Sequence, residues 1–173
     1  IITTLRFQHR SGASLAQDNI AAEQVFQGTP LTKNIKRKSH TINFKPILDS
    51  PYNAFFDPVS KKHPYTTLNQ FLKKIEGAAQ GRGQRYIFAY WPKFDSYCHK
   101  FGTDNKLAHL HFKDIDAGIK RLSRKLEKTN SIIILTADHG QINSPRKKVI
   151  LIKDHPKLLE CLSNSLSGEP RAA

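Results

Sequence analysis

The chain has 173 residues, which is room for about one ordinary domain. Lysine and arginine outnumber aspartate and glutamate by 28 to 14, for a formal net charge of +14, and 38% of the residues are hydrophobic. The longest clean apolar run is Ile132–Leu135, far short of the roughly 20 apolar residues of a transmembrane helix, so no membrane segment is present. The charge attracts polyanions without selecting a fold, which leaves nucleic acid, acidic lipid headgroups and phosphorylated small substrates as partners.

The cysteine and methionine counts bear on the redox environment of the chain and on whether it is a fragment. Cys98 and Cys161 are too few for a disulfide framework and form no C-x-x-C pair, so we expect a reducing, cytoplasmic setting. No amino-terminal stretch has the features of a signal peptide. The chain begins with Ile1 and has no methionine, and we therefore expect it to be a processed or cloned fragment, or a piece of a longer reading frame.

The first part of the chain, residues 1–64, has few regular patterns. We expect a strand in 1–7, a ragged helix in 14–26, a short strand at 41–44, and an ordered loop rich in proline and aromatic residues over 49–64. The interpretation is an irregular cap or insert (1–64) followed by a regular α/β portion (65–173), both within one partial domain.

Regular patterns begin after Tyr65. Thr67 followed three residues later by Gln70 is a capping-box signature. The apolar residues behind it recur at i, i+3, i+4 and i+7, which predicts a helix that ends within 77–83. The run Tyr86–Tyr90 then predicts a strand covered on both faces.

The second half of the chain predicts another helix and strand. Over about 104–128, apolar residues recur at steps of 4 and 3 among basic ones, which is typical of an amphipathic helix. Ile132–Thr136 predicts a second buried strand, so that strand, helix and strand form a βαβ unit with a parallel pair. Val149–Ile152 predicts a further strand, and Asp154 is expected to cap a short helix that runs through Pro156 and Leu159.

Two clusters of acidic and imidazole side chains follow the two predicted strands. Asp95 and His99 follow the first, and Asp138 and His139 follow the second. The carboxyl ends of parallel strands share one rim, where ligands bind in open α/β sheets. Carboxylates and imidazoles are the usual ligands of a divalent metal that keeps an open position. Either pair alone is a common chance pattern or a loop hydrogen bond, whereas together they predict two neighbouring metal sites.

The wider strings around these clusters carry a family resemblance. Residues 90–102, from Tyr90-Trp-Pro-Lys-Phe-Asp95 to Gly102, and residues 132–140, ending in Thr-Ala-Asp138-His139-Gly140, resemble the nucleotide pyrophosphatase/phosphodiesterase branch of the alkaline phosphatase superfamily. The similarity is strongest over 86–141. The strings at 49–53, 64–69 and 168–171 are similar to bacterial members.

The resemblance implies a fold and a chemistry. The fold is a three-layer αβα sheet of the alkaline-phosphatase type with helices on both faces, of which this chain holds the middle portion. The chemistry is hydrolysis of phosphodiester or pyrophosphate bonds in a phosphorylated small molecule, such as a nucleotide, with two divalent metals, commonly zinc. Asp95 and His99 match ligands of one metal, and Asp138 and His139 match ligands of the other.

The sequence also departs from the family pattern. An earlier metal-binding Asp, the nucleophilic Thr or Ser and a later metal-binding His have no match here, because Thr3 and Thr4 lack the context and His155 stands too early. The hydrolase activity is therefore expected of a parent protein, and this chain alone is expected to be inactive.

Two alternatives stay open: a basic nucleic-acid-binding module, and a non-catalytic degenerate fragment. No nucleic-acid-binding motif is recognisable, so no specific nucleic-acid partner is expected, and the oligomeric state is undetermined. Five other side chains are expected to have structural roles. Cys98 is expected to be a packed thiol, and His109 and His111 to be surface or boundary residues. Tyr90 and Trp91 are expected to cover the strand end, with stacking on a substrate base as the alternative.

Overall fold

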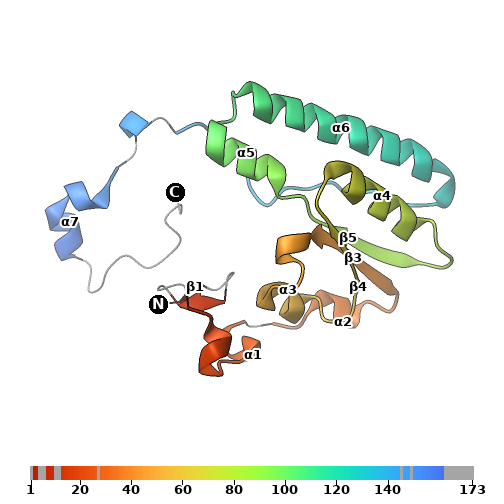
Figure 1. Cartoon of the computed structure of the whole chain (residues 1–173), viewed down its shortest axis with the longest axis horizontal. Coiled ribbons are helices and arrows are strands. Elements are labelled where there is room, and N and C mark those ends of the chain that lie inside the picture. The colour runs from red at the N-terminus through yellow and green to blue at the C-terminus, as the bar shows by residue number, and fades with distance from the viewer. Residues whose placement is uncertain are drawn as a thin grey trace.

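The structure is a computed structural model that describes residues 2–3, 7–9, 13–26, 28–144, 146–148 and 150–161. Its centre is a sheet of three parallel strands with helices around it (Figure 1). The predicted α/β class is confirmed.

The sheet consists of β3 (Lys38–Phe44), β4 (Lys61–Tyr65) and β5 (Arg85–Ala89), in the order β4-β3-β5. In the register, His40 of β3 lies opposite Lys61 on one side and Ile87 on the other. Because β3 has a neighbour on both edges, it is buried from Ser39 to Asn43.

The strands β3 and β4 test the expectations for residues 1–64. The predicted strand at 41–44 is confirmed, and it begins three residues earlier, at Lys38. The stretch expected to be a loop, 49–64, contains a short helix at Pro51–Phe56 and most of strand β4, so that expectation is wrong for 51–56 and 61–64. Pro64 hides this strand in the sequence, because proline suits only an edge position of a sheet, and an edge is where β4 lies.

Helix α4 (Leu68–Ala79) connects β4 to β5 and covers one face of the sheet. It begins as predicted, with the Thr67 hydroxyl accepting the Gln70 backbone N–H at 3.3 Å. Its apolar side packs on the strands, and the buried core between them is formed by Ile42, Tyr65, Phe71 and Ala78.

Helices α5 (Lys93–Phe101) and α6 (Lys106–Leu126) complete this side of the molecule, and α6 contacts both α4 and α5. The predicted long helix is confirmed. Gly118 of α6 lies against α4, since a Cβ atom there would stand 2.5 Å from Leu72 Cδ1. The absent side chain therefore lets the two helices approach closely.

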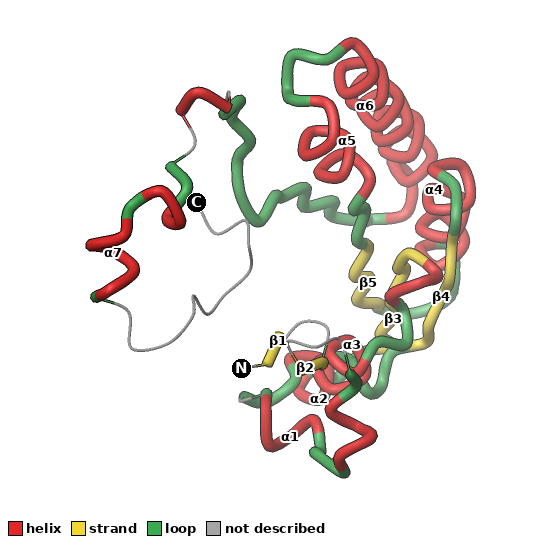
Figure 2. Tube along the Cα trace, turned by 60° about the vertical axis from the view of Figure 1, so that its left-hand side comes forward, coloured by secondary structure: helices red, strands yellow, loops and turns green. Residues whose placement is uncertain are grey.

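The amino-terminal elements contain a separate aromatic cluster. They are β1 (Ile2–Thr3), β2 (Gln8–His9), the 3₁₀ turns Leu15–Asp18 and Lys45–Ile47, and the short helices α1 (Ala22–Val25), α2 (Leu31–Asn34) and α3 (Pro51–Phe56). Phe26 is the centre of the cluster, with its ring edge-on to Tyr52 at 5.4 Å. Figures 1 and 2 show α1, α2 and α3 on the other side of the strands from α4 and α6. The helix predicted in 14–26 is instead two short pieces, Leu15–Asp18 and Ala22–Val25. The strand predicted in 1–7 is present at Ile2–Thr3, and residues 1 and 4–6 lie outside the described residues.

The predicted strand Ile132–Thr136 is wrong. The segment has no strand assignment, and its apolar side chains are exposed, with 89% of Ile132, 84% of Ile134 and 74% of Leu135 accessible. The parallel partner of β5 is β3, so the expected βαβ unit around α6 is not formed. A strand needs a backbone neighbour, and within the described residues none pairs with this segment.

The carboxy-terminal part contains the 3₁₀ turns Arg146–Lys148 and Ile152–Asp154 and the helix α7 (Pro156–Glu160). The helix is confirmed, although His155 and not Asp154 occupies its N-cap, and it makes no side-chain cap hydrogen bond. The strand predicted for Val149–Ile152 is wrong where it is described: Ile150 and Leu151 belong to no strand, and Val149 lies outside the described residues. Across the described part of the chain, no helix is long and apolar enough to cross a membrane.

Candidate metal centre

The first pair of predicted ligands lies on α5, directly beyond the carboxyl end of β5. Tyr90, Trp91 and Pro92 connect the strand to the helix, and the Tyr90 backbone N–H donates to the Ile42 carbonyl at 3.1 Å. One helical turn separates Asp95 from His99, which places both on the same helix face. Their contact is direct: His99 Nε2 lies 3.1 Å from Asp95 Oδ1.

The second pair approaches the first through a bend in the chain after residue 137. His139 Nε2 lies 3.7 Å from Asp95 Oδ1 and 3.8 Å from Asp138 Oδ1. The structure therefore brings all four predicted residues together, even though the segment before Asp138 is not a strand. The two histidines approach the same carboxylate oxygen from two different parts of the chain.

Polar side chains that the sequence reasoning missed attach this bend to α5 and to the turn that follows it. Gln141 Nε2 donates to Asp95 Oδ1 at 2.5 Å, and the Asn143 side-chain oxygen accepts the Thr103 N–H at 2.8 Å. The Asn143 amide also donates to the Asp104 carboxylate. Gly102 leaves room for this contact, because a Cβ atom there would stand 2.9 Å from Asn143 Oδ1. The only sequence signal for these residues is their position just after Gly140.

The hydrogen bond of the His139 ring fixes which nitrogen faces the carboxylates. Its Nδ1 lies 2.9 Å from the Gly140 carbonyl oxygen, which can only accept, so Nδ1 carries a proton. Nε2 is left to face Asp95 and Asp138. The Gly140 hydrogen bond and then the charge of Asp138 raise the pKa of His139, so this position favours a positively charged ring.

Two further side chains border the centre. Burial raises the pKa of the Tyr90 phenol, and the charges of Asp138 and Asp95 raise it further, which places this hydroxyl in the field of both carboxylates. Cys98 is buried, and burial followed by the charge of Asp95 raises the pKa of its thiol. The prediction of a packed thiol is confirmed.

The family model of type I phosphodiesterase / nucleotide pyrophosphatase matches residues 10–166 of the chain. The chain belongs to this family. The family consists of hydrolases of the nucleotide pyrophosphatase/phosphodiesterase type that act on small phosphorylated substrates and are generally metal-dependent. A search among curated proteins and a search among solved structures each give no match. The resemblance that rests on Asp95, His99, Asp138 and His139 is thus confirmed at the level of the family.

The side chains of this phosphodiesterase-family centre fit a divalent cation in their chemistry. Two carboxylates and two imidazoles provide the oxygen and nitrogen donors that zinc takes in catalytic sites. Their arrangement is a close cluster and not a finished cage: within the described residues, no three His, Cys, Asp or Glu side chains already surround one point. Both imidazole Nε2 atoms are directed at the Asp95 oxygen itself.

The aromatic residues beside α5 have a structural role. Trp91 stacks on Tyr65 at a ring distance of 5.2 Å and packs against the core of the sheet. This contact agrees with the prediction that Trp91 covers the end of the strand. Its indole N–H donates to His111 Nε2 at 3.0 Å. Burial lowers the pKa of His111, so this histidine is a neutral acceptor at the boundary, while His109 on the same helix is exposed.

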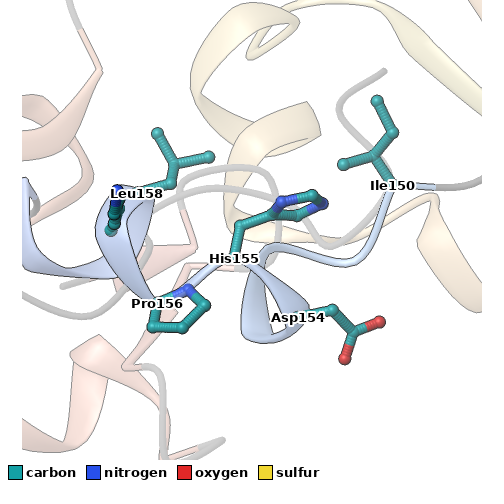
Figure 3. A pocket seen from close by; sticks show the side chains of 6 residues that line it. Ile150, Asp154, His155, Pro156 and Leu158 are labelled. Carbon is teal, nitrogen blue, oxygen red and sulfur yellow. The ribbon is translucent and has the colours of Figure 1, made fainter.

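His155, which the sequence analysis rejected as the later metal-binding histidine, lies in a shallow hollow beside α7 (Figure 3). The hollow is formed by one local stretch, Ile150 and residues 154–158. Figure 3 shows the Asp154 carboxylate and the His155 ring pointing to different sides. In the described part of the chain, His155 therefore joins no ligand set, in agreement with its dismissal on sequence grounds.

Proposed function

We propose that this chain supplies metal ligands of a phosphodiesterase or nucleotide pyrophosphatase-type hydrolase. Asp95 and His99 hold one divalent ion, and Asp138 and His139 hold a second, with zinc as the favoured metal. The observation that carries the proposal is the orientation of His139, whose Nε2 faces two carboxylates while its Nδ1 is engaged by Gly140.

An imidazole nitrogen that faces carboxylate oxygens is stabilised by a proton or a metal ion between them. With Nδ1 protonated, the neutral ring presents the Nε2 lone pair, which repels the lone pairs of Asp95 and Asp138. Either a second proton or a metal ion removes that repulsion. A backbone carbonyl on the far ring nitrogen is also the usual way in which proteins orient a metal-binding histidine.

The spacing of the two pairs supports two adjacent ions. Asp95 Oδ1 lies between His99 and His139, at 3.1 and 3.7 Å from their Nε2 atoms. When bound, two such ions about 3.5–4 Å apart stabilise the attacking and leaving oxygens of a phosphoryl displacement. The net charge of +14 draws anionic substrates toward the protein.

The nucleophile is proposed to come from outside this chain. Within the described residues, no Thr or Ser hydroxyl makes a hydrogen bond to Asp95, Asp138 or His139. The chain on its own is therefore proposed to bind metal without turning over substrate. In this proposal it is one partial domain, whose sheet and ligands belong to a larger catalytic unit.

Titration of the metal-free chain with zinc chloride at pH 7.5, followed by calorimetry against a competing chelator, tests the proposal. We expect His139→Ala and Asp95→Asn each to weaken zinc binding by at least about tenfold, as the loss of a ligand does. His109→Ala, on the exposed face of α6, is the matched control and is expected to bind zinc as the parent chain does. Equal affinities for His139→Ala and His109→Ala in folded proteins would remove the proposed site.

A further inference from the structure

A second polar pocket lies at the opposite end of the sheet from Asp95. It opens between α2 and the amino-terminal ends of β3 and β4 and has a volume of about 520 Å³. Its lining residues come from two stretches of chain, 32–40 and 59–61, and are Thr32, Lys33, Ile35, Arg37, Lys38, Ser39, His40, Val59 and Lys61. The expected ligand rim of a parallel sheet is the carboxyl end, so the amino-end position of this pocket sets it apart from the candidate metal centre.

The charge of this pocket is of one sign. Four lining side chains are cationic, Lys33, Arg37, Lys38 and Lys61, and among the described residues that line it none is acidic. The Nε atom of Arg37 donates to Gln84 Oε1 at 2.6 Å, which orients the guanidinium and leaves its other N–H groups without a partner within the described part of the chain. The pocket is therefore built to attract an anion.

A buried hydroxyl distinguishes the pocket from an ordinary basic surface. Thr32 lines it, is 7% exposed, and its Oγ1 has no hydrogen-bond partner among the described residues. A buried hydroxyl without a partner costs roughly 1–3 kcal/mol, so such groups are usually satisfied by something. A surface of solvated lysines alone would not explain the unpaired Thr32 hydroxyl.

A histidine pair at the pocket lies among positive charges. His40 lines the pocket, and its Nδ1 lies 2.9 Å from His63 Nε2, with the two rings stacked at 5.2 Å. Burial lowers the pKa of His40, and the charges of Arg85, Lys61 and Lys38 lower it further. The buried end of the pocket is thus held at positive potential by groups from β3, β4 and β5.

We propose that this pocket binds the phosphate group of a small anionic ligand. The lysines and Arg37 neutralise the charge, and the Thr32 hydroxyl donates to a phosphate oxygen. Phosphate accepts several hydrogen bonds at once and is the oxyanion for which an arginine fork and a hydroxyl are suited. Free inorganic phosphate and the phosphate of a nucleotide share this chemistry.

The test uses the whole chain in EDTA at constant ionic strength, with calorimetry and with ¹H–¹⁵N spectra that follow residues 32–40. Inorganic phosphate is titrated in one arm and adenosine monophosphate in the other. We expect saturable binding that Lys61→Gln weakens about tenfold, as the loss of a charge-assisted hydrogen bond does. Saturable binding of inorganic phosphate would show that the free anion is enough for binding. Saturable binding of adenosine monophosphate but not of phosphate would show that the pocket needs a larger ligand. Either result supports the proposal.

A neighbouring lysine provides the matched control. Lys62→Gln removes the same charge next to Lys61, but Lys62 pairs with Asp49 at 2.8 Å and does not line the pocket, so it is expected to leave binding unchanged. Thr32→Val is expected to weaken binding severalfold without lowering the unfolding midpoint, because it removes an unpaired buried hydroxyl.

Three results would overturn the proposal. They are no saturable binding in either arm, equal weakening by Lys61→Gln and Lys62→Gln, and chemical-shift changes that avoid residues 32–40. Tight binding of a DNA oligonucleotide with equal losses in both lysine variants would identify a nonspecific basic surface instead.

Discussion

Two apolar stretches lead into the two halves of the candidate metal centre. The strand β5 (Arg85–Ala89) pairs with β3 along its length and continues into Asp95 through Trp91, whose ring packs on the core. The segment 132–136 has a similar composition and leads into Asp138, but Ile132 is 89% exposed and within the described residues the segment has no pairing partner. Apolar composition thus supplies the tendency to form a strand, and a neighbouring backbone edge decides whether the strand forms.

The same contrast holds for the way the ligands are positioned. Asp95 and His99 lie on a helix that continues from a buried strand, so the core fixes their place. The approach of Asp138 and His139 depends on hydrogen bonds from Gln141 and Asn143 at the protein surface. One half of the centre is held by packing and the other by polar contacts.

The largest effect is expected from removing a side chain in the paired region. Ile42 of β3 is fully buried, so Ile42→Ala should cost about 3 kcal/mol of unfolding free energy through lost burial and the cavity left behind. Ile134 is 84% exposed, and Ile134→Ala should change the unfolding free energy by less than about 0.5 kcal/mol. Urea denaturation of the two variants measures both. Similar costs at the two positions would mean that the segment 132–136 is packed in solution, and the comparison would fail.

A smaller effect is expected at the anchor that follows β5. Trp91→Phe keeps a ring on Tyr65 but removes the donor to His111 Nε2, a half-buried acceptor, and should cost about 1–2 kcal/mol. Thermal or urea unfolding measures the loss. The double variant Trp91→Phe with His111→Leu removes both partners and should cost less than the sum of the two single changes. Additive costs would show that the hydrogen bond contributes nothing to this anchor.

The paired region should also respond to acid. Burial lowers the pKa of His40, His63 and His111, so below about pH 6.5 the unfolded chain takes up protons that the folded chain does not. The unfolding free energy should therefore fall as the pH drops below that value. Urea unfolding at pH 7.5 and pH 5.5 measures this, and His111→Gln should reduce the difference. His109→Gln, at an exposed position, should leave this pH difference in unfolding free energy unchanged. An equal reduction by both variants would contradict the role of the half-buried His111 in the pH dependence.

The smallest effect is expected at the surface contact between α4 and α6. Lys125 Nζ lies 2.8 Å from Glu76 Oε2, with 57% of the lysine side chain exposed. Lys125→Gln should cost about 0.5 kcal/mol at low salt and less at high salt, because exposed ion pairs are weak and screened. A cost above that of Trp91→Phe would mean that this exposed pair stabilises the fold more than the Trp91–His111 hydrogen bond does, against the expectation.

Local patterns predicted the two longest helices well and the sheet less well. The capping pair Thr67 and Gln70 and the apolar period of α6 are properties of neighbouring residues, so α4 and α6 follow from the sequence. Strand β4 was hidden by Pro64, and the pairing of β5 with β3 depends on residues more than forty positions apart. No local pattern encodes that choice of neighbour.

The candidate site was found from the sequence because chemistry constrains residue type strongly. The four ligand candidates follow from their Asp and His identities and the family strings, and the structure brings them together. Gln141 and Asn143 were missed, because their roles depend on which residues of α5 and its following turn lie opposite them. The pocket at Thr32 was missed for the same reason.

The most direct measurement of the central claim is anomalous X-ray diffraction at the zinc edge from crystals of the whole chain grown with zinc chloride. We predict anomalous peaks at about 2.0–2.2 Å from the donor atoms of Asp95 and His99 and of Asp138 and His139. An ordered site without zinc at those side chains, or zinc bound at His155 or Cys161 instead, would contradict the account.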